Sequence, residues 1–181
     1  MTIEEQSFLE KLDKVVQSEK VRAQILPIVE RVRADLARKS NALMAWESVA
    51  LETFGILPPA IRSGWVFILP AGTDTGAERH PNSHQRMMTF DGAGDMKMDI
   101  HRVPHEVKSE SEIAWQSNLL LSDPKAPLER RWISIPQNVW HRPVVAKNGD
   151  WVVVSFHTVR AEDLIEERPG AKQSLYSDAH R

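Results

Sequence analysis

The first third of the chain carries apolar residues at the spacing of amphipathic helices. Over residues 3–54 they recur every three or four positions, as at Phe8 and Leu12, so that each helix can bury one face. The pattern predicts about three helices. Pro27 is expected to kink or break the second one, because proline lacks the backbone N–H that a helix needs. We expect this helical extension, residues 1–57, to cover an outer face of the following sheet or to form a dimer contact.

After a Pro-Pro pair the pattern changes to short, roughly alternating apolar runs. Each run is bounded by Gly, Pro, Asp or Asn, as β-strands are; the runs are WVFIL (65–69), QRMMTF (85–90), DMKMDIHRV (95–103), SNLLL (117–121), WISI (132–135) and WVVVSFHTV (151–159). Successive strands without intervening helices favour an antiparallel barrel or sandwich. We therefore predict a mainly β domain over residues 58–168, with a closing helical turn at 161–167, and then a polar tail over residues 169–181.

Composition and charge narrow the classes of function. The formal net charge is -2 and the basic residues are spread along the chain, which argues against nucleic-acid binding. There is no cysteine, so any metal must be held by histidine, carboxylate or amide oxygen. No apolar run approaches the roughly 20 residues that span a bilayer, and the acidic N-terminus is unlike a signal peptide. We expect a cytoplasmic protein that acts on a small molecule and binds neither nucleic acid nor membrane.

The segment between the first two predicted strands holds the most informative spacing. Gly72 is followed by five residues and then by Glu78 and His80, and these are followed by Gln85 and Gly92. Alternate residues of a strand point to the same face, so the carboxylate and the imidazole can both point into a barrel. A Pro-Asn-Ser turn then returns the chain on a neighbouring strand. Such side chains suit Fe, Mn, Ni or Zn.

This spacing resembles the first motif of the cupin superfamily: a glycine, five residues, His-x-His, a glutamate and a closing glycine. Glu78 stands at a histidine position and Gln85 at the glutamate position. The run PQNVWH, which ends at His141, is similar to the second motif Pro-x-Gly-x-x-His, with Asn138 at the glycine position. The resemblance, to RmlC-like cupins, covers roughly residues 64–160. It implies a single double-stranded β-helix, or jelly-roll, barrel.

The resemblance also implies a site for a divalent metal ion. Its ligands would be Glu78, His80 and His141, completed by Gln85 or, if the turn is one residue tighter, by His84. Two histidines and one carboxylate form the ligand set associated with non-haem Fe(II) oxygen chemistry. Iron is therefore the expected metal, with Mn, Ni and Zn as alternatives.

The run from Glu78 to Gln85 is also similar to the corresponding stretch of thiol dioxygenases such as cysteine dioxygenase. A histidine at the place of His157 is a further similarity to these enzymes. Those enzymes carry three-histidine iron and a pocket tyrosine. Here the first ligand position is a glutamate, and the only tyrosine, Tyr176, falls in the predicted tail. His157 shares a strand face with Val153, so we expect it at the pocket as an acid/base or as a hydrogen-bond partner.

These observations predict a metal-dependent enzyme with oxidoreductase, dioxygenase-like chemistry on a small molecule. Two alternatives stay open. One is a non-catalytic cupin that binds a small ligand as a sensor or carrier. The other is a metal-independent isomerase of the sugar-nucleotide epimerase type, with His80 or His157 as general base. A homodimer is expected, because an exposed sheet edge and an amphipathic helical arm both favour pairing.

Overall fold

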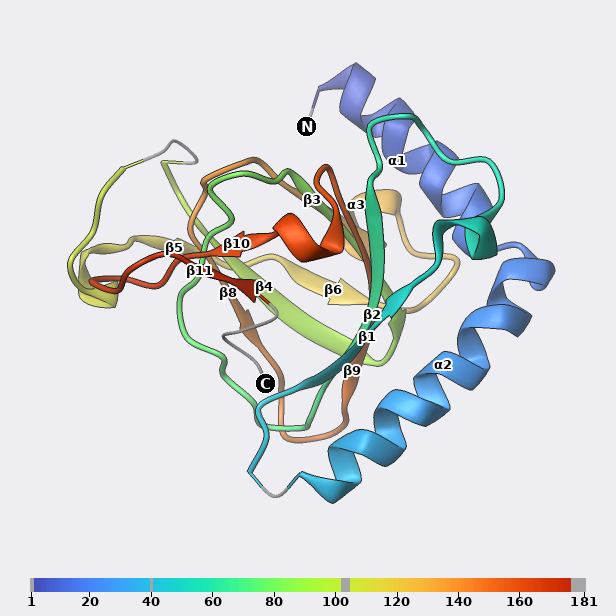
Figure 1. Cartoon of the computed structure of the whole chain (residues 1–181), viewed down its shortest axis with the longest axis horizontal. Helices are drawn as coiled ribbons and strands as arrows, with labels where there is room; N and C mark the ends of the chain where they lie inside the picture. Colours follow the sequence, from blue (N-terminus) through green and yellow to red (C-terminus); the bar gives the residue numbers. More distant parts are fainter. Residues whose placement is uncertain (1, 40, 102–104, 177–181) are drawn as a thin grey trace.

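Two antiparallel β-sheets packed face to face form the body of the molecule, and two N-terminal helices cover the outer surface of one sheet (Figure 1). The computed structural model describes residues 2–39, 41–101 and 105–176. The arrangement is the predicted mainly β jelly roll. Among the described residues, no strand ladder closes the two sheets into a continuous barrel, so the closed barrel of the prediction is an open sandwich.

The two helices each bury one stripe of apolar residues. They are α1 (Ile3–Val16) and α2 (Glu19–Arg38). Pro27 lies inside α2 but does not end it. The missing N–H removes one hydrogen bond, whereas Ile25 and Val29 on the same turns are buried in the core, and this burial keeps the helix continuous.

The third predicted helix is instead a strand followed by a short turn. Strand β1 (Ala45–Val49) pairs antiparallel with β2 (Ser63–Leu69), and the 3₁₀ turn η1 (Leu51–Phe54) connects them. The ring centroids of Trp46 and Trp65 lie 4.8 Å apart. Pairing with β2 satisfies the backbone of this stretch and overrides its weak helical spacing. The sheet therefore begins before the predicted start of the β domain.

The first sheet has the strand order β1-β2-β9-β3-β7. Its remaining strands are β9 (Trp151–His157), β3 (Gln85–Asp91) and β7 (Trp132–Ile135). Most residues of these strands are buried, because the helices cover one face and the other face forms the interior of the sandwich. In the register of β3 and β9, Gln85 lies opposite His157.

The second sheet is built around β4 (Ala93–Asp99). Strand β8 (His141–Val144) pairs along one side of it, and β5 (Trp115–Gln116) and β6 (Leu119–Leu121) pair along the other. The residues before β3 run beside β8, so that Glu78 forms an isolated bridge with the first residue of that strand. The other short elements are η2 (Glu110–Glu112), α3 (Leu128–Arg131), η3 (Ala161–Asp163), β10 (Ile165–Glu166) and β11 (Ser174–Leu175).

The C-terminal segment forms a two-stranded sheet of its own. Strands β10 and β11 pair with each other, and Arg79 and Glu167 exchange both of their backbone hydrogen bonds. The expected closing helical turn over 161–167 is only the 3₁₀ turn η3, followed by β10. Tyr176, which the sequence places in a loose polar tail, is only 3% exposed. The tail therefore returns to the fold at Tyr176, although residues 170–175 are exposed.

Gly92 in the first motif and Asn138 in the second have left-handed backbone conformations. Gly92 has a φ of 76°, and a Cβ added there would lie 2.1 Å from the carbonyl oxygen of Asp150. Asn138 has a φ of 64°, which asparagine tolerates better than most residues, and its N–H donates to the carbonyl of His80 at 2.9 Å. The requirement for a left-handed residue explains why asparagine can replace the glycine of the second motif.

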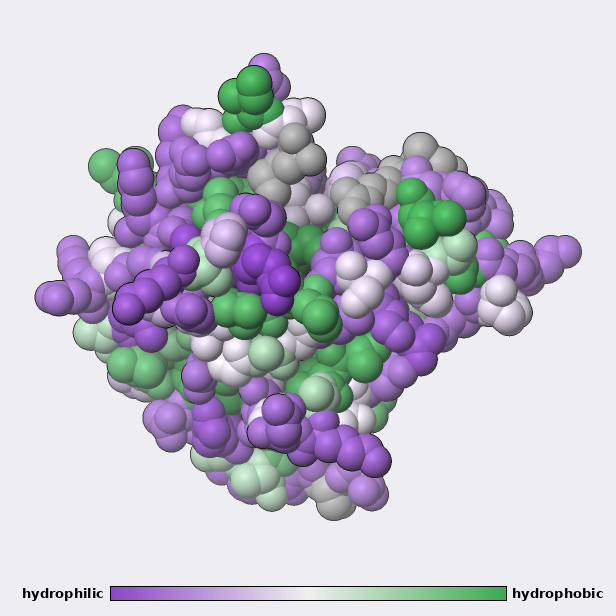
Figure 2. All heavy atoms as spheres, turned by 180° about the vertical axis from the view of Figure 1, so that it is seen from behind, coloured by the Kyte–Doolittle hydropathy of each residue, from purple (hydrophilic) through white to green (hydrophobic). Residues whose placement is uncertain are grey.

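The surface seen from behind is largely hydrophilic, with apolar residues gathered near its centre (Figure 2). Among the described residues, no helix combines the length and the apolar character needed to cross a membrane. The single chain does not test the expected homodimer, which stays a prediction.

Candidate metal centre

Three potential metal ligands meet in the interior of the sandwich. Glu78, His80 and His141 are buried, and their candidate ligand atoms all lie within 4.8 Å of one another. Glu78 and His141 exchange backbone hydrogen bonds of 2.8 Å in both directions, which holds the two motifs side by side. His80 lies two residues after Glu78, so alternation along the extended chain sends both side chains to the same side.

Backbone carbonyls set the tautomers of the two imidazoles. Nδ1 of His80 lies 3.0 Å from the carbonyl oxygen of Ile165, and Nδ1 of His141 lies 3.1 Å from that of Val139. A carbonyl oxygen only accepts hydrogen bonds, so each Nδ1 carries a hydrogen. In the neutral rings Nε2 therefore keeps its lone pair, as it does in histidines that bind metals.

The carboxylate of Glu78 faces one of these lone pairs. Its Oε1 lies 3.4 Å from Nε2 of His141, and this nitrogen is buried with no hydrogen-bond partner among the described residues. Two acceptors facing each other are stable only with a proton or a cation between them. Metal bonds of about 2.0–2.2 Å place the ligand atoms about 3–4 Å apart, so the group needs only a small contraction to bind a metal ion.

The charge states of the group suit a divalent cation. Burial raises the pKa of Glu78, but the interactions with His141, His80 and Arg168 outweigh it and lower this pKa to about 2. Burial, followed by the electrostatic interaction with His141, lowers the pKa of His80 to about 4. At neutral pH Glu78 is thus a carboxylate and His80 is a neutral imidazole, which are the forms that bind metal.

A small cavity of about 30 Å³ lies next to the group. Its polar lining comes from Glu78, His80, Gln85, His157 and Tyr176. The rest of the lining is apolar and consists of Met44, Phe67, Leu69, Met87, Met96, Pro143, Trp151 and Val153.

Gln85 and His157 enter this cavity from the first sheet. The Nε2 of Gln85 donates to Oγ of Ser155 at 3.1 Å, and the ring of His157 lies 5.3 Å from that of His80. Burial, followed by the electrostatic interactions with His80 and His141, lowers the pKa of His157 well below its ordinary value. His157 is therefore neutral at pH 7. The ligand role of Gln85 and the acid/base role of His157 stay predictions.

Tyr176 is the pocket residue that the sequence interpretation missed. Its ring centroid lies 5.9 Å from that of His80, and its hydroxyl donates to the sulfur of Met44 at 3.7 Å. Burial raises the pKa of Tyr176 well above its ordinary value, so the phenol keeps its proton at neutral pH. The only local signal was an apolar Leu175-Tyr176 pair within an otherwise polar tail.

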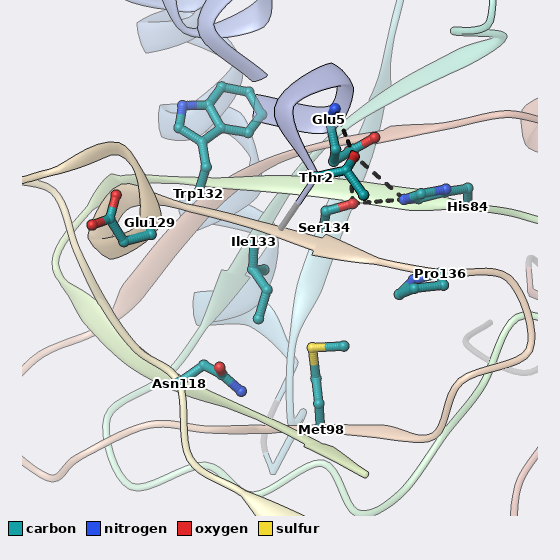
Figure 3. A pocket seen from close by; sticks show the side chains of 10 residues that line it. All are labelled: Thr2, Glu5, His84, Met98, Asn118, Glu129, Trp132, Ile133, Ser134 and Pro136. Carbon is teal, nitrogen blue, oxygen red and sulfur yellow. Dashed lines mark hydrogen bonds and ion pairs between the residues drawn. The ribbon is translucent and has the colours of Figure 1, made fainter. Parts of the chain in front are cut away.

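His84 is not brought to the three-residue group. It lies in an outer pocket of about 440 Å³ beside the start of α1 (Figure 3). Its Nε2 lies 2.6 Å from Oγ of Ser134, and this hydroxyl donates to Oε1 of Glu5 at 2.7 Å. Neighbouring residues of an extended chain point to opposite sides, so His84 points outward where Gln85 points inward. The tighter turn that would have let His84 replace Gln85 is absent.

Comparison with known proteins gives similarity in fold only. No protein-family model matches the chain, and no curated protein sequence matches it significantly. Similar solved structures include oxalate oxidase in complex with the substrate analogue glycolate, with 11% identity, a TM-score of 0.47, and coverage of 76% of this chain and 57% of that one. CapF, the capsular polysaccharide assembling protein of Staphylococcus aureus, has 13% identity, a TM-score of 0.47, and coverage of 67% and 29%. The coconut allergen cocosin has 13% identity, a TM-score of 0.49, and coverage of 72% and 29%. The chain thus spans less than two thirds of each of these proteins.

Proposed function

On the premise that this chain has the cupin fold, we propose that it is a metal-dependent enzyme that acts on a small molecule by oxidoreductase, dioxygenase-like chemistry, with iron as the metal. The observation that carries the proposal is the convergence of Glu78, His80 and His141, with both imidazoles held through Nδ1 so that each Nε2 is left for a metal bond. Two histidines and one carboxylate leave coordination positions open for other ligands.

Bound Fe(II) would supply redox chemistry at these open positions. The side chains of the chain itself hold the ion, position the reactants and exclude water. The apolar walls of the cavity keep bulk water from the reacting groups. Tyr176 keeps a proton on its phenolic oxygen at the edge of the cavity, while His157 is neutral and can accept one.

The metal can be tested without knowing the substrate. Elemental analysis of the untagged protein is expected to find a transition metal, and added Fe, Mn, Ni or Zn should raise the thermal stability of the metal-free form. His80→Ala and His141→Ala should abolish this gain. The matched control is His84→Ala, which removes a nearby imidazole that lies outside the group. A protein that binds no metal, and gains no stability from any of the four, would contradict the proposal.

The oxygen chemistry needs a second measurement. Oxygen uptake by the Fe(II)-loaded protein is followed with a panel of small thiols and small 2-hydroxy and 2-oxo acids. Uptake that depends on one of these compounds and on His80 supports the dioxygenase-like activity. Metal binding without uptake would favour the sensor or carrier, and turnover that resists a chelator would favour the isomerase.

A further inference from the structure

A row of buried polar side chains leads from the cavity into the first sheet. Gln85 Nε2 lies 3.1 Å from Ser155 Oγ, which lies 3.3 Å from Nε2 of His157, and Nδ1 of His157 lies 3.2 Å from Ser83 Oγ. All four side chains belong to residues that are buried. Each contact is between polar groups that water cannot reach, so the directions of these hydrogen bonds depend on one another.

The direction of the row is set at its inner end. The hydroxyl of Ser83 accepts from the N–H of Thr158 at 3.2 Å and donates to the carbonyl oxygen of His84 at 3.3 Å. A hydroxyl has one hydrogen, so Ser83 has none left for His157. With the hydroxyl hydrogen of Ser83 on the carbonyl of His84, Nδ1 of His157 is the donor to Ser83.

The hydrogen on Nδ1 of His157 also fixes the directions of the next two hydrogen bonds, toward the cavity. Because Nδ1 of neutral His157 carries the hydrogen, its Nε2 is an acceptor and receives the hydroxyl hydrogen of Ser155. Ser155 Oγ then accepts from the amide nitrogen of Gln85. The amide is thereby held with its nitrogen toward Ser155 and its oxygen on the other side.

The amide oxygen of Gln85 has no partner of its own. Oε1 is buried and makes no hydrogen bond among the described residues, although Gln85 lines the cavity. Folded proteins leave few buried carbonyl oxygens unpaired, because the lost hydration is not compensated. An acceptor held in one orientation at a cavity is a binding group for a hydrogen-bond donor.

The rest of the lining limits what the donor can belong to. No lysine or arginine is among the described lining residues, so a negative charge on a ligand would have to be balanced at the metal. Gln85 is neutral, so it offers a hydrogen bond without a charge of its own. The remaining walls are apolar and the space is small. These features suit a compact ligand with one oxygen group for the metal and one donor group beside it.

We propose that Gln85 is a substrate-binding residue whose Oε1 accepts a hydrogen bond from the hydroxyl or amino group of a small 2-hydroxy or 2-amino acid. The inference rests on the proposed metal site and deepens it, because it names the class of substrate. It also gives Gln85 a role other than that of metal ligand. Ser155 and His157 hold the amide in this orientation.

The test compares two probes that differ by one hydroxyl group. The Co(II)-loaded protein is titrated with glycolate and with acetate, and the visible spectrum of the cobalt reports binding. The wild type is expected to bind glycolate about tenfold more tightly than acetate, as one hydrogen bond to a buried acceptor allows. Gln85→Leu, which has a similar volume and no acceptor, should lose most of this preference and bind Co(II) as the wild type does.

Two further variants keep the result interpretable. Ser155→Ala leaves Gln85 in place but frees its amide, so the preference for glycolate should fall by less than in Gln85→Leu; this variant also serves if Gln85→Leu does not fold. Ser134→Ala, outside the cavity, should keep the full preference. An undiminished preference in Gln85→Leu would overturn the inference, and so would weaker cobalt binding in that variant, since Gln85 would then be a ligand. A wild type that binds neither cobalt nor any of Fe, Mn, Ni and Zn would overturn the proposed function and this inference with it.

Discussion

Arg168 donates from its Nη2 to the carboxylate Oε2 of Glu78 at 3.0 Å, while the other oxygen of that carboxylate faces His141. The guanidinium is fixed on its other sides by Oε1 of Glu166 and by the carbonyl oxygen of Thr75, both at 2.7 Å. It therefore holds the carboxylate in one rotation. The C-terminal segment thus orients a candidate metal ligand that lies in a different part of the chain.

Replacement of Arg168 by methionine should weaken metal binding. The apolar stem is kept, but Glu78 loses the donor that orients it, and partners of this kind are worth about 10–100-fold in metal affinity. The metal affinity of Arg168→Lys should lie between those of the wild type and Arg168→Met, because an ammonium keeps the charge but cannot reproduce the planar fork of a guanidinium. Competition with a chromophoric zinc chelator measures the affinity. Arg31→Met, which breaks an exposed pair with Glu47, is the control and should change nothing. Equal affinities for the Met variant and the wild type would show that Arg168 does not act on the site.

The metal-free protein should lose stability as the pH falls. The unfolded chain binds a proton at His80 near pH 6.5, whereas the folded chain does so only at a pKa of about 4. Between these values the unfolded state holds more protons, so the free energy of unfolding decreases as the pH drops. The decrease for this residue is on the order of 2 kcal/mol between about pH 7.5 and about pH 5. The lowered pKa of His157 acts in the same direction.

Urea unfolding at the two pH values, with a chelator present, measures this effect. His80→Asn should reduce the pH dependence, because the asparagine does not titrate. His84→Asn is a suitable comparison, since this histidine is partly exposed and lies outside the three-residue group. A wild type whose stability rose on acidification would be inconsistent with the buried neutral imidazoles.

Asn138 should tolerate replacement by glycine. Residues that adopt the left-handed conformation less readily than asparagine should destabilise the fold. Because Asn138 has a φ of 64°, Asn138→Ala is expected to destabilise the fold by about 1 kcal/mol, and Asn138→Gly should be close to neutral. Thermal unfolding compares the two variants. If alanine proved the better replacement, backbone conformation would not be the reason for asparagine at this position.

Pro27 is expected to destabilise α2. It is exposed and lies inside the helix, where it removes one backbone hydrogen bond. Pro27→Ala is expected to stabilise the protein by roughly 1–3 kcal/mol. Gln24→Ala, at another exposed position of the same helix, should change stability by only a few tenths of a kcal/mol. Denaturant midpoints of the two variants and the wild type measure these changes in stability. A loss of stability in Pro27→Ala would mean that the proline fits a bend that the helix requires.

Much of the fold and of the site could be predicted from local patterns. The strand at Trp151–His157 and the helix at Ile3–Val16 each carry the periodicity of their own secondary structure. Glu78 and His80 share a face because they are two residues apart, and the spacing of the second motif identified His141. Such features depend on short stretches of chain, so the pattern of residue types is sufficient to predict them.

Other features of the fold and of the site depend on contacts between segments that are distant in the sequence. The local pattern of residue types does not predict such contacts. Ala45–Val49 is a strand because β2 lies beside it, and Tyr176 is a pocket residue because β11 brings it next to His80. Arg168 contacts Glu78 across most of the length of the β domain. The free energy of each arrangement comes from burial and pairing with partners far away in the chain. The amino-acid order therefore specifies which groups are available, and the packing of the two sheets selects which of them meet.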